Sequence, residues 1–411
     1  MKNKLLSNTI YLYILTIVKM VFPLVTLPYL TRILSVEIYG SVAYVKSYMS
    51  YVQLVLDFGF LLSATKNIAV AKGKDDTRIE YIVGNTLAEK VILLFAAVVV
   101  TFFASIFIPI LYANQTFLWL YFLAIAITIL LPDFLYRGIE RMECVTIPYT
   151  VAKVIAIILT LILIKDDSDL MLIPVFEIIS NAVAVLISFI LLKKLGIRIR
   201  FSNIKIWIRD LKESAVYFIS NFATTVFGAL TTIIVGILLD ETDVAYWSVC
   251  MQIVSAAKSL YAPISNSIYP YMVTNRDLKL VTKIRNLMTV PMIIGSVIVI
   301  FFGKQIMLII GGENYGYAGY ILKLLLPVIV ASFYSMLYGW PVLGAIGKVQ
   351  QTTISTIVAA VIQVGGIIII YCLGLFNLVS LALCCGVSEI MLLVIRYGIF
   401  IKNKESFMEK S

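Results

Sequence analysis

Long apolar segments recur from one end of the chain to the other. A helix of about 20 apolar residues crosses the hydrocarbon core of a bilayer, and the pattern predicts twelve such spans. The segments are continuously apolar, whereas strands of a membrane β-barrel alternate apolar and polar residues. The sequence therefore predicts an all-α, polytopic membrane protein. The predicted spans cover residues 8–31, 41–62, 81–108, 116–135, 147–164, 170–192, 214–238, 244–270, 286–303, 319–341, 352–373 and 377–400.

Composition agrees with this pattern and excludes some chemistry. Of the 411 residues, 61% are hydrophobic and 14% are charged, against roughly 45–50% apolar residues in soluble domains. The first apolar segment is too long for a cleaved signal peptide. The chain has no histidine, so a proton relay would need carboxylates, tyrosines or water. No CxxC motif occurs among the five cysteines, so we expect neither a metal site nor a disulfide framework.

The basic residues orient the chain in the membrane. Twenty-three lysines and arginines fall on one set of alternating flanks, and only Arg32, Lys165 and Lys304 fall on the other. Cytoplasmic loops of membrane proteins carry an excess of lysine and arginine. We therefore expect both termini in the cytoplasm. The net charge of +10 is then a topology signal, and nucleic acid is not an expected partner.

The longest and most basic loop follows six spans, so the second half begins in the same orientation as the first. This arrangement predicts a parallel internal repeat related by an axis along the membrane normal. Short matches support it weakly: VFPL at 21–24 with VFGA at 226–229, and YGSV at 39–42 with YWSV at 246–249. The predicted parts are a six-helix bundle over 1–195, a cytoplasmic amphipathic linker over 196–213, a second bundle over 214–400 and a basic tail over 401–411.

Two lysines lie near the middle of apolar spans. Lys19 and Lys258 are too deep to reach the interface easily, and a central lysine costs roughly 2.5–3.5 kcal/mol on insertion. Such residues usually face a bundle interior or a water-filled cavity. We therefore expect the two bundles to surround a central cavity with a cationic lining.

Polar residues at helical spacing extend this cavity. Lys46, Ser50, Gln53 and Asp57 share one face of the second span. Tyr217, Asn221, Thr224, Gly228 and Thr231 form a similar stripe in the seventh, and the lysines at 19 and 258 lie on polar faces of the first and eighth. Close helix packing is the alternative explanation for the small polar residues, and it stays open for them.

The other charges inside spans have simpler interpretations. Lys323 and Arg396 lie near span ends, where long side chains reach the interface. Lys90 has a similar structural interpretation, and Glu177 and Glu389 are expected to be interhelical hydrogen-bond partners. Asp57 would pair with a lysine of another helix or carry a coupling ion. Four prolines, Pro23, Pro28, Pro263 and Pro270, permit kinks in the first and eighth spans.

Three segments resemble the polysaccharide repeat-unit flippases of bacteria, the O-antigen flippase branch of the multidrug/oligosaccharidyl-lipid/polysaccharide exporter superfamily. These segments are PLVTLPYLTRILSVEIYGSVAYV at 23–45, PDFLYRGIERM at 132–142 and SAVYFISNFATTVFGALTTIIVGILLDETDVAYWSVCMQIV at 214–254. The resemblance extends from about residue 5 to 400 and includes the number of spans. Gly138 and Glu140 belong to the second segment.

The resemblance implies the flipping of undecaprenyl-diphosphate-linked oligosaccharides from the inner to the outer leaflet by alternating access, for O-antigen, capsule or exopolysaccharide. Lys19, Lys46 and Lys258, with Lys153 as a weaker candidate, match positions of cavity cations in the family, and as lysines they bind phosphate as point charges. With Gln53, Asn221 and Thr224 they are the predicted substrate-binding residues. Ion antiport with H⁺ or Na⁺ is implied, with Asp57 as the candidate. No P-loop is present, and no other cofactor is expected.

Other functions remain open. A multidrug or cation antiporter of the same superfamily would favour an acidic cavity, whereas this lining is basic. A polymerase that joins repeat units, or another membrane enzyme, usually needs charged catalytic clusters in a large external loop, and here the external loops are short. A flippase for the peptidoglycan precursor usually has two further spans. Expected partners are the lipid-linked oligosaccharide, membrane lipids and the polysaccharide polymerase; a monomer is consistent with a cavity inside one chain.

Overall fold

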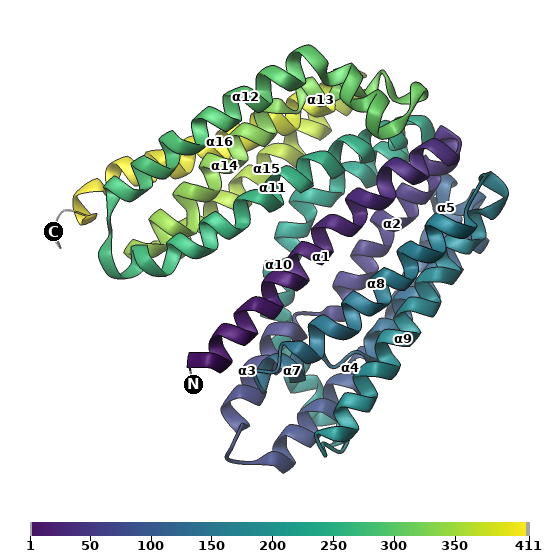
Figure 1. The fold of residues 1–411 in the computed structure, drawn as a ribbon, viewed down its shortest axis with the longest axis vertical. Coiled ribbons are helices and arrows are strands. Elements are labelled where there is room, and N and C mark those ends of the chain that lie inside the picture. The colour runs from purple at the N-terminus through teal and green to yellow at the C-terminus, as the bar shows by residue number, and fades with distance from the viewer. Residues whose placement is uncertain (1, 408–411) are drawn as a thin grey trace. The chain divides into compact units, whose positions relative to one another are not determined.

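The computed structural model describes residues 2–407; the side chains at 2–6, 220, 221, 223–229, 262, 266, 270, 274 and 406 are outside that description. The chain forms two compact units, Met1–Thr225 and Val226–Ser411. The boundary falls inside one continuous helix, so the predicted amphipathic linker helix and the seventh predicted span are a single element. Figure 1 shows the ribbon of both units.

The first unit contains nine helices and the beginning of a tenth. They are α1 (Lys2–Ile33), α2 (Val36–Asp57), α3 (Phe60–Ala71), α4 (Asp76–Phe107), α5 (Pro109–Ala113), α6 (Gln115–Ile127), α7 (Asp133–Gly138), α8 (Glu143–Leu163), α9 (Leu172–Lys194) and α10 (Ile204–Leu238). Short 3₁₀ turns, Thr128–Leu130 and Asp167–Met171, lie between them.

The second unit continues α10 and adds six α-helices. They are α11 (Glu241–Asn275), α12 (Leu278–Gly311), α13 (Ala318–Leu324), α14 (Leu326–Leu337), α15 (Val349–Cys372) and α16 (Leu378–Lys402). A π-helical turn, η4 (Tyr338–Leu343), follows α14. Short 3₁₀ turns lie at Glu313–Tyr315, Gly344–Ile346 and Lys404–Phe407.

The helices confirm the all-α membrane fold. In the part of the chain that the structure describes, ten helical segments are long and apolar enough to cross a membrane. α10 and α11, each 35 residues long, lie at the seventh and eighth predicted spans. At about 1.5 Å per residue, each is longer than the hydrocarbon core is thick.

Equivalent helices pack in equivalent ways inside the two units. In the first unit, α9 packs against α6 and α8, and α2 packs against α6. In the second, α16 packs against α14 and α15, and α11 packs against α14. Both sets join the fourth span to the sixth, the fifth to the sixth and the second to the fourth. This agreement supports the predicted parallel repeat.

The breaks between helices lie away from all four prolines at which kinks were expected. α1 continues through Pro23 and Pro28 to Ile33. The second span instead breaks at Phe58 (φ 35°) and Gly59 (φ 77°), between α2 and α3. A Cβ at Gly59 would lie 2.7 Å from Cβ of Tyr217 in α10, so the close approach of α10 requires glycine here. The fourth span breaks in both units, before α7 and at η4.

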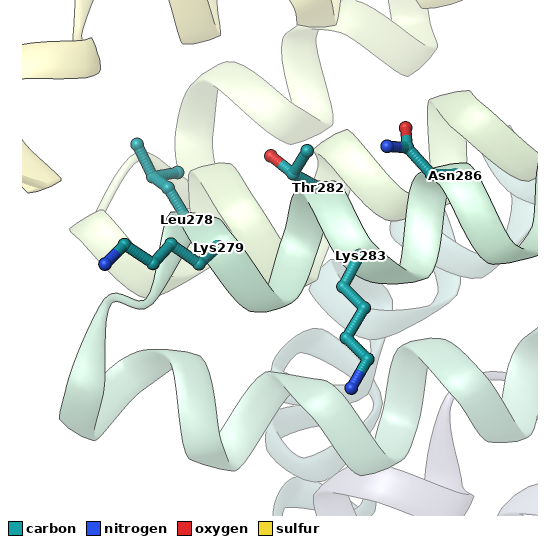
Figure 2. Close-up of a pocket in the computed structure, with 5 residues that line it drawn as sticks. All are labelled: Leu278, Lys279, Thr282, Lys283 and Asn286. Carbon is teal, nitrogen blue, oxygen red and sulfur yellow. The ribbon is translucent and has the colours of Figure 1, made fainter.

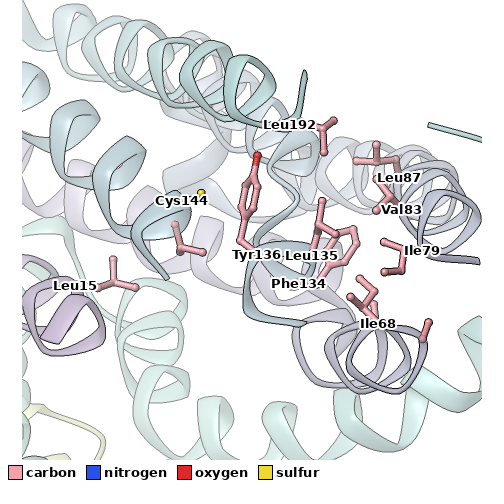
Figure 3. Close-up of a cluster of buried hydrophobic side chains, with 13 residues drawn as sticks. Leu15, Ile68, Ile79, Val83, Leu87, Phe134, Leu135, Tyr136, Cys144 and Leu192 are labelled. Atoms are coloured by element: carbon pink, nitrogen blue, oxygen red, sulfur yellow. The ribbon is translucent and has the colours of Figure 1, made fainter. Parts of the chain in front are cut away.

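A buried hydrophobic cluster holds α7 in the first unit (Figure 3). Phe134 and Tyr136 of α7 pack among Ile68 of α3 and Val83 of α4, and all four side chains are buried. The hydroxyl of Tyr136 donates a 2.5 Å hydrogen bond to the carbonyl of Ser188 in α9. The short helix after the break in the fourth span is therefore fixed by both apolar and polar contacts.

The segment before α10 is bound to the start of α4. Gly84 lies so close to the backbone that a Cβ there would be 2.0 Å from the carbonyl oxygen of Arg200. The Arg200 side chain forms a 2.7 Å ion pair with Glu80, and Asn85 accepts hydrogen bonds from the backbone N–H of Ser202 at 2.9 Å and from Trp207 Nε1 at 3.0 Å. Residues 198–203 are thus packed against α4.

Candidate functional site

A charged cluster lies inside the first unit, between α2, α8 and α9. Lys153 Nζ of α8 is 2.7 Å from Glu177 Oε2 of α9, and each side chain is less than a quarter exposed. Lys46, on α2, interacts electrostatically with both residues. Lys46 therefore lies in electrostatic reach of a carboxylate that already pairs with Lys153. Since one carboxylate balances one lysine, this group of three has a surplus positive charge inside an apolar bundle.

A second group of charges continues the cluster toward α7. Lys90 of α4 is buried, 3.8 Å from Asp57 Oδ1 at the end of α2, and lies over the Phe134 ring at 5.8 Å. Asp133 of α7 interacts electrostatically with Arg137 of the same helix and with Lys90. Asp57 is therefore paired with a lysine of another helix, as one of its two predicted roles requires.

Lys19 of α1 connects the two groups. Its Nζ lies 5.2 Å from the centre of the Tyr149 ring on α8, a cation–π distance. It also interacts electrostatically with Asp133, Asp57 and Lys153. The eight side chains in contact or in electrostatic reach contain five basic and three acidic groups. They are Lys19, Lys46, Asp57, Lys90, Asp133, Arg137, Lys153 and Glu177.

This arrangement favours an anionic ligand. Paired charges in a low-dielectric interior largely compensate each other, whereas surplus charge needs a counter-ion. Phosphate groups bind lysine as a point charge. Tyr149 lies beside Lys19, and Thr150 on the same helix has a buried hydroxyl oxygen without a hydrogen-bond partner.

Lys258 has different surroundings, in the second unit. Its Nζ lies 2.9 Å from Glu389 Oε2 on α16, and Glu389 is almost completely buried. The other carboxylate oxygen of Glu389 accepts a 3.2 Å hydrogen bond from Ser335 Oγ. Glu389 is therefore an interhelical hydrogen-bond partner, as expected. Here the lysine of the second span makes the close ion pair itself, and Arg396 also interacts electrostatically with Glu389.

The remaining predicted site residues are placed as follows. Gln53 accepts a 3.0 Å hydrogen bond from Thr128 Oγ1, which joins α2 to the break in the fourth span. The side chains of Asn221 and Thr224 lie outside the described residues. Among the residues that the structure describes, no group of histidine, cysteine, aspartate or glutamate could hold a metal ion.

Arg396 is the clearest correction. We expected it to reach the membrane interface, but its side chain is buried. It donates hydrogen bonds to the carbonyl of Ser335 at 2.7 Å, to Ser355 Oγ at 3.0 Å and to Thr356 Oγ1 at 2.9 Å. Position along a span does not reveal which neighbouring helices offer acceptors, so interior hydrogen bonds replaced the expected interfacial position.

Two surface pockets of the structure are lined by other residues. One, of about 380 Å³, follows the start of α12 and is lined by Leu278, Lys279, Thr282, Lys283 and Asn286. Figure 2 shows that Lys283 points away from Thr282 and Asn286, so the side chains of this single helix do not converge. The other, of about 650 Å³, lies in the first unit between α4 and the segment before α10.

The fold resembles those of solved membrane transporters. The protein is similar to the lipid II flippase MurJ in an inward closed conformation, with a TM-score of 0.73, 14% identity, and coverage of 99% of this chain and 90% of that one. It is also similar to an inward-facing multidrug transporter of the MATE family in the MOP superfamily, with a TM-score of 0.68, 13% identity, and coverage of 95% and 99%. At these identities the likeness shows the fold: an all-α membrane protein of this superfamily's architecture.

The sequence comparison identifies the family. Residues 5–276 match the family described as "Polysaccharide biosynthesis protein", and the chain belongs to it. A relative from Shigella dysenteriae, named "Putative O-antigen transporter", is 27% identical over 79% of this chain and 83% of its own. A relative of the same name from Escherichia coli (strain K12) is 26% identical over 82% of this chain and 83% of its own. The relatives are thus named as transporters, not enzymes.

Proposed function

We propose that this protein is a flippase that moves undecaprenyl-diphosphate-linked oligosaccharide repeat units across the bacterial cytoplasmic membrane for surface polysaccharide synthesis. The family, the transporter names of the relatives and the likeness to a lipid flippase support this proposal. The observation that carries it is the surplus of positive charge inside the first unit, where Lys46 and Lys153 share Glu177.

The chemistry of the substrate explains that surplus. A diphosphate is anionic and sugars are polar, so neither crosses hydrocarbon without a polar path. Lys19, Lys46 and Lys153 provide positive charge for the diphosphate. Each ammonium group that contacts a phosphate oxygen would form a charge-assisted hydrogen bond. Gln53, Asn221 and Thr224 offer amide and hydroxyl groups to the sugars. The lipid chain stays in the bilayer while the headgroup crosses.

Alternating access would supply the transport cycle, with one six-span unit moving against the other. Asp57 is the candidate for ion coupling, because its side chain is 49% exposed and is held by Lys90 only at 3.8 Å. A proton or Na⁺ at Asp57 would weaken that pairing. The expected setting is the inner membrane with both termini in the cytoplasm, with a monomer as the transporting unit and the polysaccharide polymerase as a partner.

A multidrug antiporter is the second candidate, favoured by the fold likeness to a MATE transporter. A cationic drug would meet a cluster with more basic than acidic groups, which repels it. The charge balance therefore favours the anionic lipid headgroup.

A deletion strain separates the two functions. Loss of surface polysaccharide, with single repeat units on undecaprenyl diphosphate accumulating at the cytoplasmic face, is the expected result. The glycan on that lipid would identify the substrate. Normal polysaccharide with increased sensitivity to cationic drugs would instead indicate the multidrug antiporter, and exported but unjoined units would indicate a polymerase.

Thiol labelling tests the proposed orientation. In a cysteine-free variant, a cysteine at Asp167 should react with an impermeant thiol reagent added to intact cells. A cysteine at Asn203 should react only after the membrane is permeabilised. The reverse pattern would overturn the assignment of both termini to the cytoplasm.

A further inference from the structure

A lysine–glutamate pair occurs at equivalent places in both halves of the chain. Lys258 follows Lys46 by 212 residues, and Glu389 follows Glu177 by the same distance. The local sequence repeats as well: each lysine precedes a serine and each glutamate precedes an isoleucine. In both units the lysine lies on the second span and the glutamate on the sixth. The pair is therefore a repeated element of the fold.

The two copies of the pair differ in whether a second lysine lies beside the glutamate. In the first unit, Lys153 takes the carboxylate of Glu177 at 2.7 Å, and Lys46 stays in electrostatic reach of both. The position 212 residues after Lys153 is Gly365, which has no side chain to compete. Lys258 therefore pairs directly with Glu389, at 2.9 Å.

The second copy is connected to a larger network. Glu389 Oε1 accepts a hydrogen bond from Ser335 Oγ, and the carbonyl of the same serine accepts one from Arg396 at 2.7 Å. Arg396 continues to Ser355 and Thr356 of α15. One chain of polar contacts thus crosses α11, α16, α14 and α15, and its middle members are buried.

This network ends at the break in the fourth span of the second unit. Gly339, inside η4, departs from helical geometry with ψ −113°, and Pro341 has no N–H for the carbonyl one turn earlier. A Cβ at Gly339 would lie 2.9 Å from the guanidinium of Arg396. Arg396 therefore fills the space beside the break and supplies a donor to the last turn of α14, where carbonyls lose their helical partners.

We propose that Lys258, Glu389 and Arg396 are positioning residues that form one interhelical lock, which fixes α11 and the broken fourth span to α15 and α16. Lys258 then acts through Glu389 rather than as a ligand of the anionic headgroup. This assignment rests on the proposed function. Under it, the lysines that bind phosphate are those of the first unit. It revises the sequence-based role of Lys258 while keeping that of Lys46.

The test compares pair removal with single removal in proteoliposomes, using the lipid-linked repeat unit extracted from the deletion strain as substrate. Lys258→Met alone should lower the maximal transport rate at least fivefold, because it removes the ion-pair partner of Glu389. The apparent KM should change less than twofold. Lys258→Met with Glu389→Gln removes both charges and should recover the rate to within twofold of the wild-type protein. A double variant that stays as slow as the single one, or whose KM rises, would overturn the lock.

Two further variants keep the outcome interpretable. If Lys258→Met does not fold, recovery of folded protein in the double variant supports the lock, and continued misfolding contradicts it. Arg396→Lys keeps the charge but not the planar donor group, so it should slow transport at unchanged KM. A wild-type rate would exclude Arg396 from the lock. Lys46→Met should raise KM; if it has no effect, the proposed function fails while the lock is judged separately.

Discussion

The two units use the same helix order and the same lysine–glutamate pair, yet they balance charge in different ways. In the first unit, two lysines face one carboxylate, and the surrounding groups remain more basic than acidic. In the second, Glu389 pairs with Lys258 at 2.9 Å and accepts a hydrogen bond from a serine, while Arg396 lies in electrostatic reach and donates its own hydrogen bonds to neighbouring helices. The sequence position equivalent to Lys153 is Gly365, so in the second unit the lysine of the second span makes the close ion pair itself.

This difference shows why a buried charge is an incomplete functional signal. A deep lysine costs free energy in any membrane span, so it must serve some purpose. The side chain that the lysine contacts determines which purpose it serves. A lysine in a close ion pair with a buried carboxylate contributes to helix packing, whereas a lysine whose nearest carboxylate already pairs with another lysine remains able to attract an anion.

The largest expected difference between the units concerns stability. Lys258→Met should lower the free energy of unfolding by about 3–5 kcal/mol, the cost of leaving a buried charge without its partner. Lys46→Met should cost less than about 1 kcal/mol, because Glu177 keeps Lys153. Unfolding of the purified proteins in the same detergent measures both. Equal losses would show that the two pairs are equivalent after all.

A smaller difference is expected at the helix breaks. Gly59→Ala should cost about 2–3 kcal/mol, because φ is +77° and a Cβ would press on the backbone of α10 at 2.8 Å. Gly339→Ala should cost about 1 kcal/mol, since the atom in its way is the movable end of Arg396. The same unfolding assay ranks the two variants, and a larger loss at Gly339 would mean that Arg396 cannot move.

The smallest effect concerns the helix shared by the two units. Burial, opposed by neighbouring Arg209, raises the pKa of the Asp210 carboxyl near the start of α10. A raised pKa in the folded protein means that ionised Asp210 opposes folding, and that stability is gained as the pH falls through this pKa. Asp210→Asn should therefore be slightly more stable than the wild-type protein at pH 7, by less than about 1 kcal/mol. The gap should shrink as the pH falls through this raised pKa toward the ordinary carboxyl value of about 4, and a gap that stays constant down to that pH would contradict the assignment.

Hydrophobic pattern was sufficient to predict the fold, because apolar length and charge bias are properties of each segment alone. The partners of the charged residues were not predictable in this way. Spacing within α2 places Lys46 and Asp57 on one face, but it does not show that Glu177 or Lys90 lies opposite. The repeated Lys-Ser and Glu-Ile dipeptides were the available signal for the paired positions, and the short matches used for the repeat did not include them.

The positions of the helix breaks were also not predictable from the hydrophobic pattern. Pro23 and Pro28 permit a kink in α1, and the helix continues through both without a break. The second span breaks at Phe58 and Gly59 within a continuous apolar run, where hydropathy gives no sign. The glycine was the local signal, and its reason is the approach of α10, a contact between residues about 160 positions apart in the sequence.

The docked segment before α10 has a practical consequence for anyone who wants to modify the protein. The carbonyl of Arg200 occupies the space that a side chain at Gly84 would need. Residues 198–203 are therefore packed too closely against α4 to accommodate an insertion. A fluorescent protein, an affinity tag or a protease site inserted there would pull this segment off α4 and expose Asn85 and Glu80. The turn at Gly73, where an added Cβ meets nothing within 4 Å, is the better place for an insertion.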